Sequence, residues 1–121
     1  MKPAEAREEA LRSLYEADLR RDLPDCTGLT QRASDLALGV WGERSGLDEA
    51  IGAVSTGWRV ERMPPVDRNV LRMALWELRH RPDTPVAVVI SEAVRLAKTY
   101  STARSGGFVN GVLAKLAEER R

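Results

Sequence analysis

The chain has 121 residues, of which 43% are hydrophobic and 31% are charged, as expected for one globular domain with a modest core. Its formal net charge of +1 does not by itself indicate a nucleic-acid binder, and the single cysteine, Cys26, excludes an intrachain disulfide and a cysteine-based metal cluster. No apolar run approaches the roughly 20 residues of a membrane span, and the N-terminal segment has no apolar signal-peptide block, so we expect a cytoplasmic protein with no membrane partner.

Apolar residues recur at helical spacing through the first half of the chain. The pattern predicts three helices, which run from Pro3 to about Arg21, from Leu29 to Trp41 and from Leu47 to about Thr56. Ser45-Gly46 separates the second helix from the third. Pro64-Pro65 then interrupts the pattern, because a proline inside a helix removes a backbone hydrogen bond and clashes with the preceding turn.

The second half predicts three more helices, which run from Asp67 to about Arg81, from Thr84-Pro85 to about Tyr100 and from Ser105 to Ala117. The carboxylate of Asp67 suits the positive end of a helix dipole, and the cations of Arg79-His80-Arg81 suit the negative end. No segment predicts a strand. The short connections between these segments favour an all-α, antiparallel helical bundle.

No sequence motif indicates catalysis. Phosphate-binding glycine loops, zinc-protease motifs and serine-hydrolase motifs do not occur in the sequence. His80 lies among arginines at a predicted helix end, where a cation is structurally favourable. The adjacent carboxylates of Glu8-Glu9 and of Asp48-Glu49 point apart on their helices, unlike a paired catalytic acid and base. We therefore expect a binding protein without a cofactor or a metal, and not an enzyme.

Charge is distributed unevenly along the chain. Residues 1–58 carry 7 basic and 11 acidic side chains, for a net charge of −4, whereas residues 59–121 carry 12 and 7, for a net charge of +5. This asymmetry indicates an anionic partner for the second half. The alternative is that the charges scatter over solvated helix faces.

Several segments carry a more specific pattern: AREEALRSLYEADL at 6–19, DRNVLRMALWEL at 67–78, PVAVVISEAVRLAK at 85–98 and FVNGVL at 108–113. Read in this order, they resemble the NusB family of bacterial transcription antitermination factors. Residues 22–62 match only in their helical pattern. The resemblance implies an all-α fold of about six to seven helices in two helical subdomains, which we place at residues 1–62 and 63–121.

The resemblance also implies a function. NusB proteins bind single-stranded boxA RNA from ribosomal operon leaders together with the ribosomal protein NusE, and with other Nus factors they help RNA polymerase to read through terminators. The RNA surface lies on the first helix and around the start of the last one. The residues that it implies here are Lys2, Arg7, Arg12, Tyr15, Lys98, Tyr100, Arg104, Ser105 and Phe108.

A surface for a protein partner is expected on the helix that carries Trp76. Its candidate residues are Asp67, Arg72, Trp76 and Glu77. Three aromatic residues, Phe108, Tyr15 and Trp76, also have an alternative interpretation as core residues. The small residues in SGGFVNGVLAKLA, at 105–117, are expected either to let a ligand approach the backbone or to let helices pack closely.

The sequence departs from the family pattern at two places. The family's N-terminus is usually arginine-rich, whereas residues 2–5 are KPAE. Residues 104–107, before FVNG, are RSGG, where the family usually has an acidic residue, Ser, His and Lys. We therefore hypothesise that Arg104 supplies positive charge that the N-terminus lacks.

Two other functions remain open. The same fold could be a protein scaffold that binds NusE or a second copy of itself, as a homodimer, with weak intrinsic RNA binding. It could also be an accessory domain of an RNA cytosine methyltransferase, although no methyltransferase sequence follows residue 121.

Overall fold

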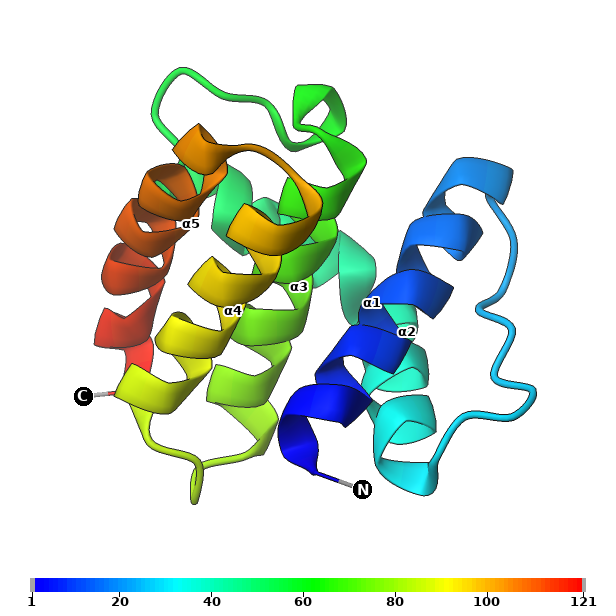
Figure 1. Cartoon of the computed structure of the whole chain (residues 1–121). Helices are drawn as coiled ribbons and strands as arrows, with labels where there is room; N and C mark the ends of the chain where they lie inside the picture. The colour runs from blue at the N-terminus through cyan, green and yellow to red at the C-terminus, as the bar shows by residue number, and fades with distance from the viewer. Residues whose placement is uncertain (1, 121) are drawn as a thin grey trace.

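The computed structural model describes residues 2–120, which form a helical protein without a strand in that range. Figure 1 shows its five α-helices. They are α1 (Pro3–Arg20), α2 (Gln31–Val54), α3 (Pro65–His80), α4 (Val86–Tyr100) and α5 (Ala103–Leu116). Two short 3₁₀ turns, η1 (Val60–Arg62) and η2 (Ala117–Arg120), precede α3 and follow α5. The predicted all-α class is confirmed.

The predicted number of six to seven helices is too high, because α2 is one helix where the sequence suggested two. Gly42, Ser45 and Gly46 lie on its exposed side, so the helix loses little packing there. A glycine inside a helix costs roughly 1 kcal/mol, whereas burial of Leu47 and Ile51 contributes roughly 1.5–3 kcal/mol for each side chain. Burial therefore outweighs the local preference for a break.

The helix ends follow local signals in the sequence. α3 begins at Pro65, two residues before the predicted Asp67, and Asp67 lies in its first turn as the sequence predicts. α5 begins two residues before the predicted Ser105, because Thr102 caps it. The Thr102 hydroxyl accepts a hydrogen bond from the Ser105 backbone N–H, and the Ser105 hydroxyl accepts one from the Thr102 backbone N–H.

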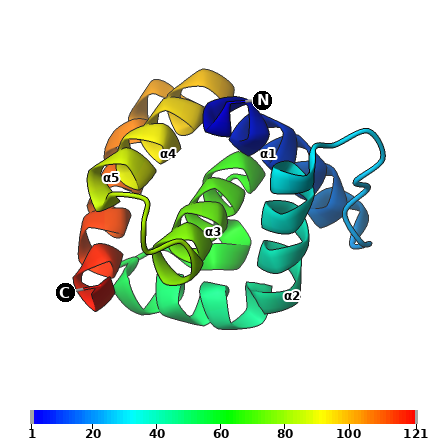
Figure 2. The ribbon, with the colours of Figure 1, turned by 90° about the horizontal axis from the view of Figure 1, so that it is seen from below.

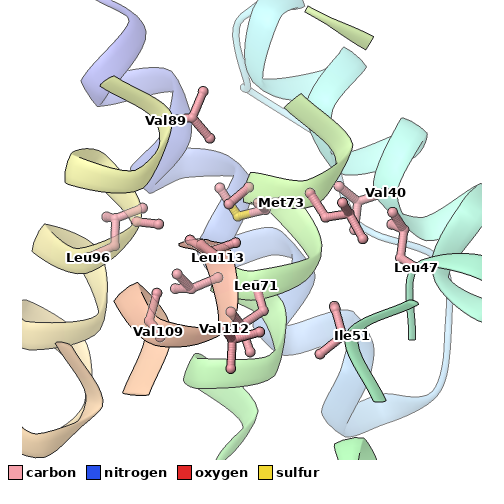
Figure 3. Close-up of a cluster of buried hydrophobic side chains, with 14 of the residues drawn as sticks. Val40, Leu47, Ile51, Leu71, Met73, Val89, Leu96, Val109, Val112 and Leu113 are labelled. Atoms are coloured by element: carbon pink, nitrogen blue, oxygen red, sulfur yellow. The ribbon is translucent and has the colours of Figure 1, made fainter. Parts of the chain in front are cut away.

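Helix α3 lies at the centre of the bundle, as seen from below in Figure 2. It packs against each of the other four helices, and every residue from Val70 to Leu75 is buried. Figure 3 shows the core around it, where Leu71 and Met73 meet side chains from α2, α4 and α5. Because this cluster contains residues from both sides of Pro64-Pro65, the predicted halves 1–62 and 63–121 share one core.

Helices α2 and α3 approach closely at one glycine. A Cβ atom at Gly39 would lie 2.5 Å from the Trp76 ring, so the indole packs directly on the α2 backbone.

Two further findings concern helix length and metal-ligating side chains. No helix within residues 2–120 is long and apolar enough to cross a membrane. The same residues contain no group of three His, Cys, Asp or Glu side chains that could hold a metal ion.

Candidate nucleic-acid interface

Three of the residues implied for RNA binding meet in one groove between α1 and the end of α4. This α1/α4 groove has a volume of about 260 Å³ and is lined by Glu8, Leu11, Arg12, Tyr15, Val66 and Tyr100. Tyr15 is 36% exposed and Tyr100 is 48% exposed, so both rings are accessible from solvent. The groove therefore offers two aromatic surfaces and the Arg12 cation to one ligand.

A buried ion pair between α1 and α3 positions α1. Arg7 donates from Nε to Glu77 Oε2 at 2.9 Å and from Nη2 to Glu77 Oε1 at 3.0 Å. Arg7 is 4% exposed and Glu77 is 2% exposed. Both residues therefore hold α1 against α3 in this structure, and neither presents its charge at the surface, although the sequence analysis expected each to contact a ligand or partner.

A second ion pair ties α1 to α4 at the rim of the α1/α4 groove. Arg95 donates to Glu8 and Glu92, at 3.0 and 2.9 Å. This pairing raises the pKa of Arg95, chiefly through the hydrogen bonds from the guanidinium to Glu92 and Glu8. The positive charge of Arg95 therefore lies beside the Glu8 carboxylate at the rim of the groove and partly offsets its negative charge.

A second pocket lies between η1 and the start of α5, next to the α1/α4 groove. This Trp58 pocket has a volume of about 430 Å³ and is lined by Trp58, Arg62, Pro64, Asp67, Thr102, Arg104, Ser105 and Phe108. The Trp58 and Phe108 rings pack at a centroid distance of 5.9 Å and an angle of 59°. Phe108 is half-buried, so it both touches the core and borders this pocket.

Ser105 and Asp67 form the base of the Trp58 pocket, and both are buried. The Ser105 hydroxyl donates to Asp67 Oδ2 at 2.9 Å, which ties the start of α5 to the start of α3. The other carboxylate oxygen, Asp67 Oδ1, is also buried and has no hydrogen-bond partner among the described residues. The hydrogen bond between Ser105 and Asp67 thus holds together the two helix starts that form this side of the pocket.

The glycines around the start of α5 differ in their surroundings. A Cβ atom at Gly106 would lie 2.6 Å from Lys98 Cε, so Gly106 gives the Lys98 stem room to cross the start of α5. A Cβ atom at Gly107 or Gly111 would meet nothing within 4 Å. Close packing therefore explains only Gly106.

Four of the implied RNA contacts are exposed cations, namely Lys2, Arg12, Lys98 and Arg104, and so is Arg62, which the family resemblance does not imply. Among residues 2–120, no carboxylate forms an ion pair with any of the following: Lys2, Arg12, Lys98, Arg104 and Arg62. Arg12 and Arg104 line the two pockets described above. These side chains keep their full positive charge for an anionic ligand.

The four candidates for a protein partner do not form one surface. Arg72 is buried and bonds both oxygens of Asp48, from Nε at 2.6 Å and from Nη2 at 2.7 Å. Burial alone would lower the pKa of Arg72, but its contacts with Asp48 and Asp18 raise it. Trp76 is half-buried on the α2 side, where it donates to Glu43. Within the described residues, these groups chiefly join helices to each other.

Sequence reasoning missed Trp58 and Arg62, which line the second pocket. The sequence analysis assigns no role to the segment WRVER, at 58–62, which lies between the third predicted helix and Pro64-Pro65. Its signal was a large aromatic residue within a polar, cationic segment, which is unusual for a connecting loop.

Comparison with known proteins identifies relatives over most of the chain. The NusB family model matches residues 4–118. The chain is 46% identical to the transcription antitermination protein NusB of Anaeromyxobacter dehalogenans (strain 2CP-1), over 93% of this chain and 87% of that one. It is 54% identical to the transcription antitermination protein NusB of Sorangium cellulosum, over 71% of this chain and 61% of that one.

Solved structures show the same fold. T. maritima NusB superimposes with a TM-score of 0.86 and 33% identity, over 98% of this chain and 92% of that one. A chain in the crystal structure of the antitermination factors NusB and NusE in complex with dsRNA gives a TM-score of 0.82 and 26% identity, over 96% of each chain.

Proposed function

This chain belongs to the NusB family, and from that premise we propose that it is a transcription antitermination factor that binds boxA-type single-stranded RNA together with the ribosomal protein NusE. In this role it works in the cytoplasm with other Nus factors, lets RNA polymerase read through terminators, and acts chiefly in ribosomal RNA operons. The name of the NusB–NusE–dsRNA structure supports both RNA and NusE as partners. The proposed role is regulatory and involves no catalysis.

The α1/α4 groove is the observation that carries the RNA-binding proposal. Proteins recognise single-stranded RNA by stacking unpaired bases on aromatic rings and by placing cations at the phosphates. Tyr15 and Tyr100 supply two accessible rings in one groove, and Arg12 lies beside them. Lys98, two residues before Tyr100, extends the positive charge along the end of α4.

The start of α5 supplies further positive charge. Arg104 is exposed and borders the Trp58 pocket, so its guanidinium can contact an RNA phosphate. Lys2 is the single cation at residues 2–5, and it lies at the N-terminal end of α1. Arg104 therefore compensates in part for the reduced positive charge at the N-terminus.

The direct test is equilibrium binding of labelled boxA RNA, measured by fluorescence anisotropy over a salt series, with and without NusE. A scrambled RNA of the same length is the control. The expected result is tighter binding of boxA than of the scrambled RNA, a further gain with NusE, and a strong dependence on salt. Equal binding of both RNAs in every condition would contradict the proposal and favour the scaffold function.

A further inference from the structure

The Trp58 pocket has the composition of a nucleotide site. Trp58 is 54% exposed although it is one of the largest apolar side chains of the protein. Its indole packs against the Phe108 ring on one side, which leaves its other surface accessible. A rigid, accessible aromatic ring is the usual platform on which a protein stacks an unpaired base.

The charges of the pocket are arranged for one nucleotide. Arg62 and Arg104 line it, both are exposed, and neither forms an ion pair within residues 2–120. The base of the pocket is different, because Asp67 is buried there with one carboxylate oxygen unpartnered. A carboxylate repels phosphate. Phosphates are therefore favoured at the arginines, and a base is favoured inside.

The pocket also continues the α1/α4 groove. Val66 lines the groove and Asp67 lines the pocket, while Tyr100 lines the groove and Thr102 lines the pocket. Both sites are thus lined by residues of the same short segments, at the start of α3 and around the turn between α4 and α5. Figure 1 shows these two segments at the same end of the bundle. A single strand that stacks on Tyr100 can continue into the Trp58 pocket.

We infer that the Trp58 pocket is a second nucleotide subsite, in which one unpaired base of the RNA stacks on the Trp58 indole while Arg62 and Arg104 contact the phosphates beside it. This inference rests on the proposed RNA-binding function and extends it by one site. The bound class is a single-stranded RNA nucleotide.

The test combines protein variants with an abasic scan of the RNA. Labelled boxA RNAs, each lacking one base, are bound to wild-type protein, Trp58→Ala, Trp58→Phe and Tyr100→Ala. Trp58→Ala should weaken binding of the intact RNA by about tenfold, whereas Trp58→Phe should retain most of the affinity because it keeps an aromatic ring. At one RNA position, removal of the base should weaken binding to the wild-type protein but not to Trp58→Ala. The two changes remove the same contact, between that base and the Trp58 indole, so their effects do not add.

The controls separate this inference from the proposed function and from a folding defect. Circular dichroism and the binding of Trp58→Phe show whether the fold is intact. If Tyr100→Ala weakens binding but Trp58→Ala binds as tightly as wild type, or loses affinity equally at every abasic position, the subsite is overturned and the RNA-binding function stands. If wild-type protein does not select boxA RNA, both are overturned.

Discussion

The molecule uses arginine in two contrasting regions. At the interfaces of α3, Arg7 and Arg72 are buried and make two-pronged contacts with carboxylates. Around the two proposed RNA sites, Arg12, Arg62 and Arg104 are exposed and have no carboxylate partner among residues 2–120. The same side chain thus serves the fold in one region and remains available to a polyanion in the other.

Because of this difference, we expect that mutations of the buried arginines lower stability, whereas mutations of the exposed arginines lower RNA affinity. Removal of one member of a buried pair leaves an uncompensated charge, which is costly for the fold. Removal of an exposed cation leaves the fold nearly unchanged but takes away one phosphate contact.

The largest expected effect is on the buried side of the comparison. Arg7→Ala should lower the free energy of unfolding by about 3 kcal/mol, because the buried Glu77 would lose its two shortest ion-pair contacts and keep only Arg81, whose Nη1 lies 3.4 Å from Glu77 Oε1. Urea denaturation measures this change. Arg12→Ala, five residues along the same helix, is the matched control and should change stability by less than about 0.5 kcal/mol. Equal stabilities for the two variants would show that the Arg7–Glu77 pair contributes little.

The second expected effect is a dependence of stability on pH. Burial alone would raise the pKa of Asp18, but hydrogen bonds from Arg68 and Asn69 and the charge of Arg72 hold it below the ordinary value of 3.8. As the pH falls, the unfolded chain therefore takes up this proton before the folded chain does, and stability is lost. The contribution of Asp18 is complete above about pH 5 and declines below about pH 4.

Asp18→Asn tests this effect, because it removes the titrating group and keeps a similar shape. Thermal unfolding between pH 3 and pH 7 should show a shallower acid decline for the variant than for wild type. Asp35→Asn, an exposed carboxylate on α2 without an ion pair among residues 2–120, is the control and should retain the wild-type profile. An unchanged acid decline in Asp18→Asn would contradict the assigned cause.

The third effect belongs to the exposed side. Arg12→Ala and Arg104→Ala should each reduce the slope of log affinity for boxA RNA against log salt by about 0.7. Lys115→Ala removes an exposed cation from the last turn of α5, away from both pockets, and should leave the slope unchanged. If Lys115→Ala has the same effect as Arg104→Ala, the positive charge acts without a defined site.

The smallest expected effect concerns Gly106. A methyl group there would lie 2.6 Å from Lys98 Cε and 2.9 Å from Lys98 Cγ, so the whole Lys98 side chain would be displaced, and Gly106→Ala should lower RNA affinity about as much as Lys98→Ala does. The fold should be unchanged or stabilised by up to about 1 kcal/mol, because alanine favours the helix. Gly111→Ala, where a Cβ meets nothing, should give the stability gain without loss of affinity. Unchanged affinity in Gly106→Ala would remove Lys98 from the RNA surface.

The fold was predicted well where local chemistry decides it. Pro64-Pro65 marks the boundary before α3 through its fixed backbone geometry, and this signal lies in adjacent residues. The Thr102 cap was not identified, so the predicted start of α5 is two residues late. The continuity of α2 was missed because tertiary burial of Leu47 and Ile51 overrides the glycines near them. Helical periodicity alone does not reveal whether burial in the core will outweigh the cost of glycines inside a helix.

The candidate site was predicted only in part, for a related reason. Tyr15 and Tyr100 were identified from the family resemblance, and the structure places them in one groove. Arg7 was identified in the same way, but its partner, Glu77, lies 70 residues away, so no local pattern indicates the buried pair. Trp58 was missed because its role depends on Phe108, which is also distant in sequence.

The central claim is that the exposed region around the α1/α4 groove and the Trp58 pocket is the RNA surface. Backbone amide chemical-shift perturbation on addition of boxA RNA tests it most directly, because it reports every helix at once. We predict that the largest shifts fall on residues 8–15, 58–67 and 98–108, with little change along the middle of α2. Large shifts centred on α2, around Trp41 and Arg44, would contradict the claim and place the RNA on the opposite side of the bundle.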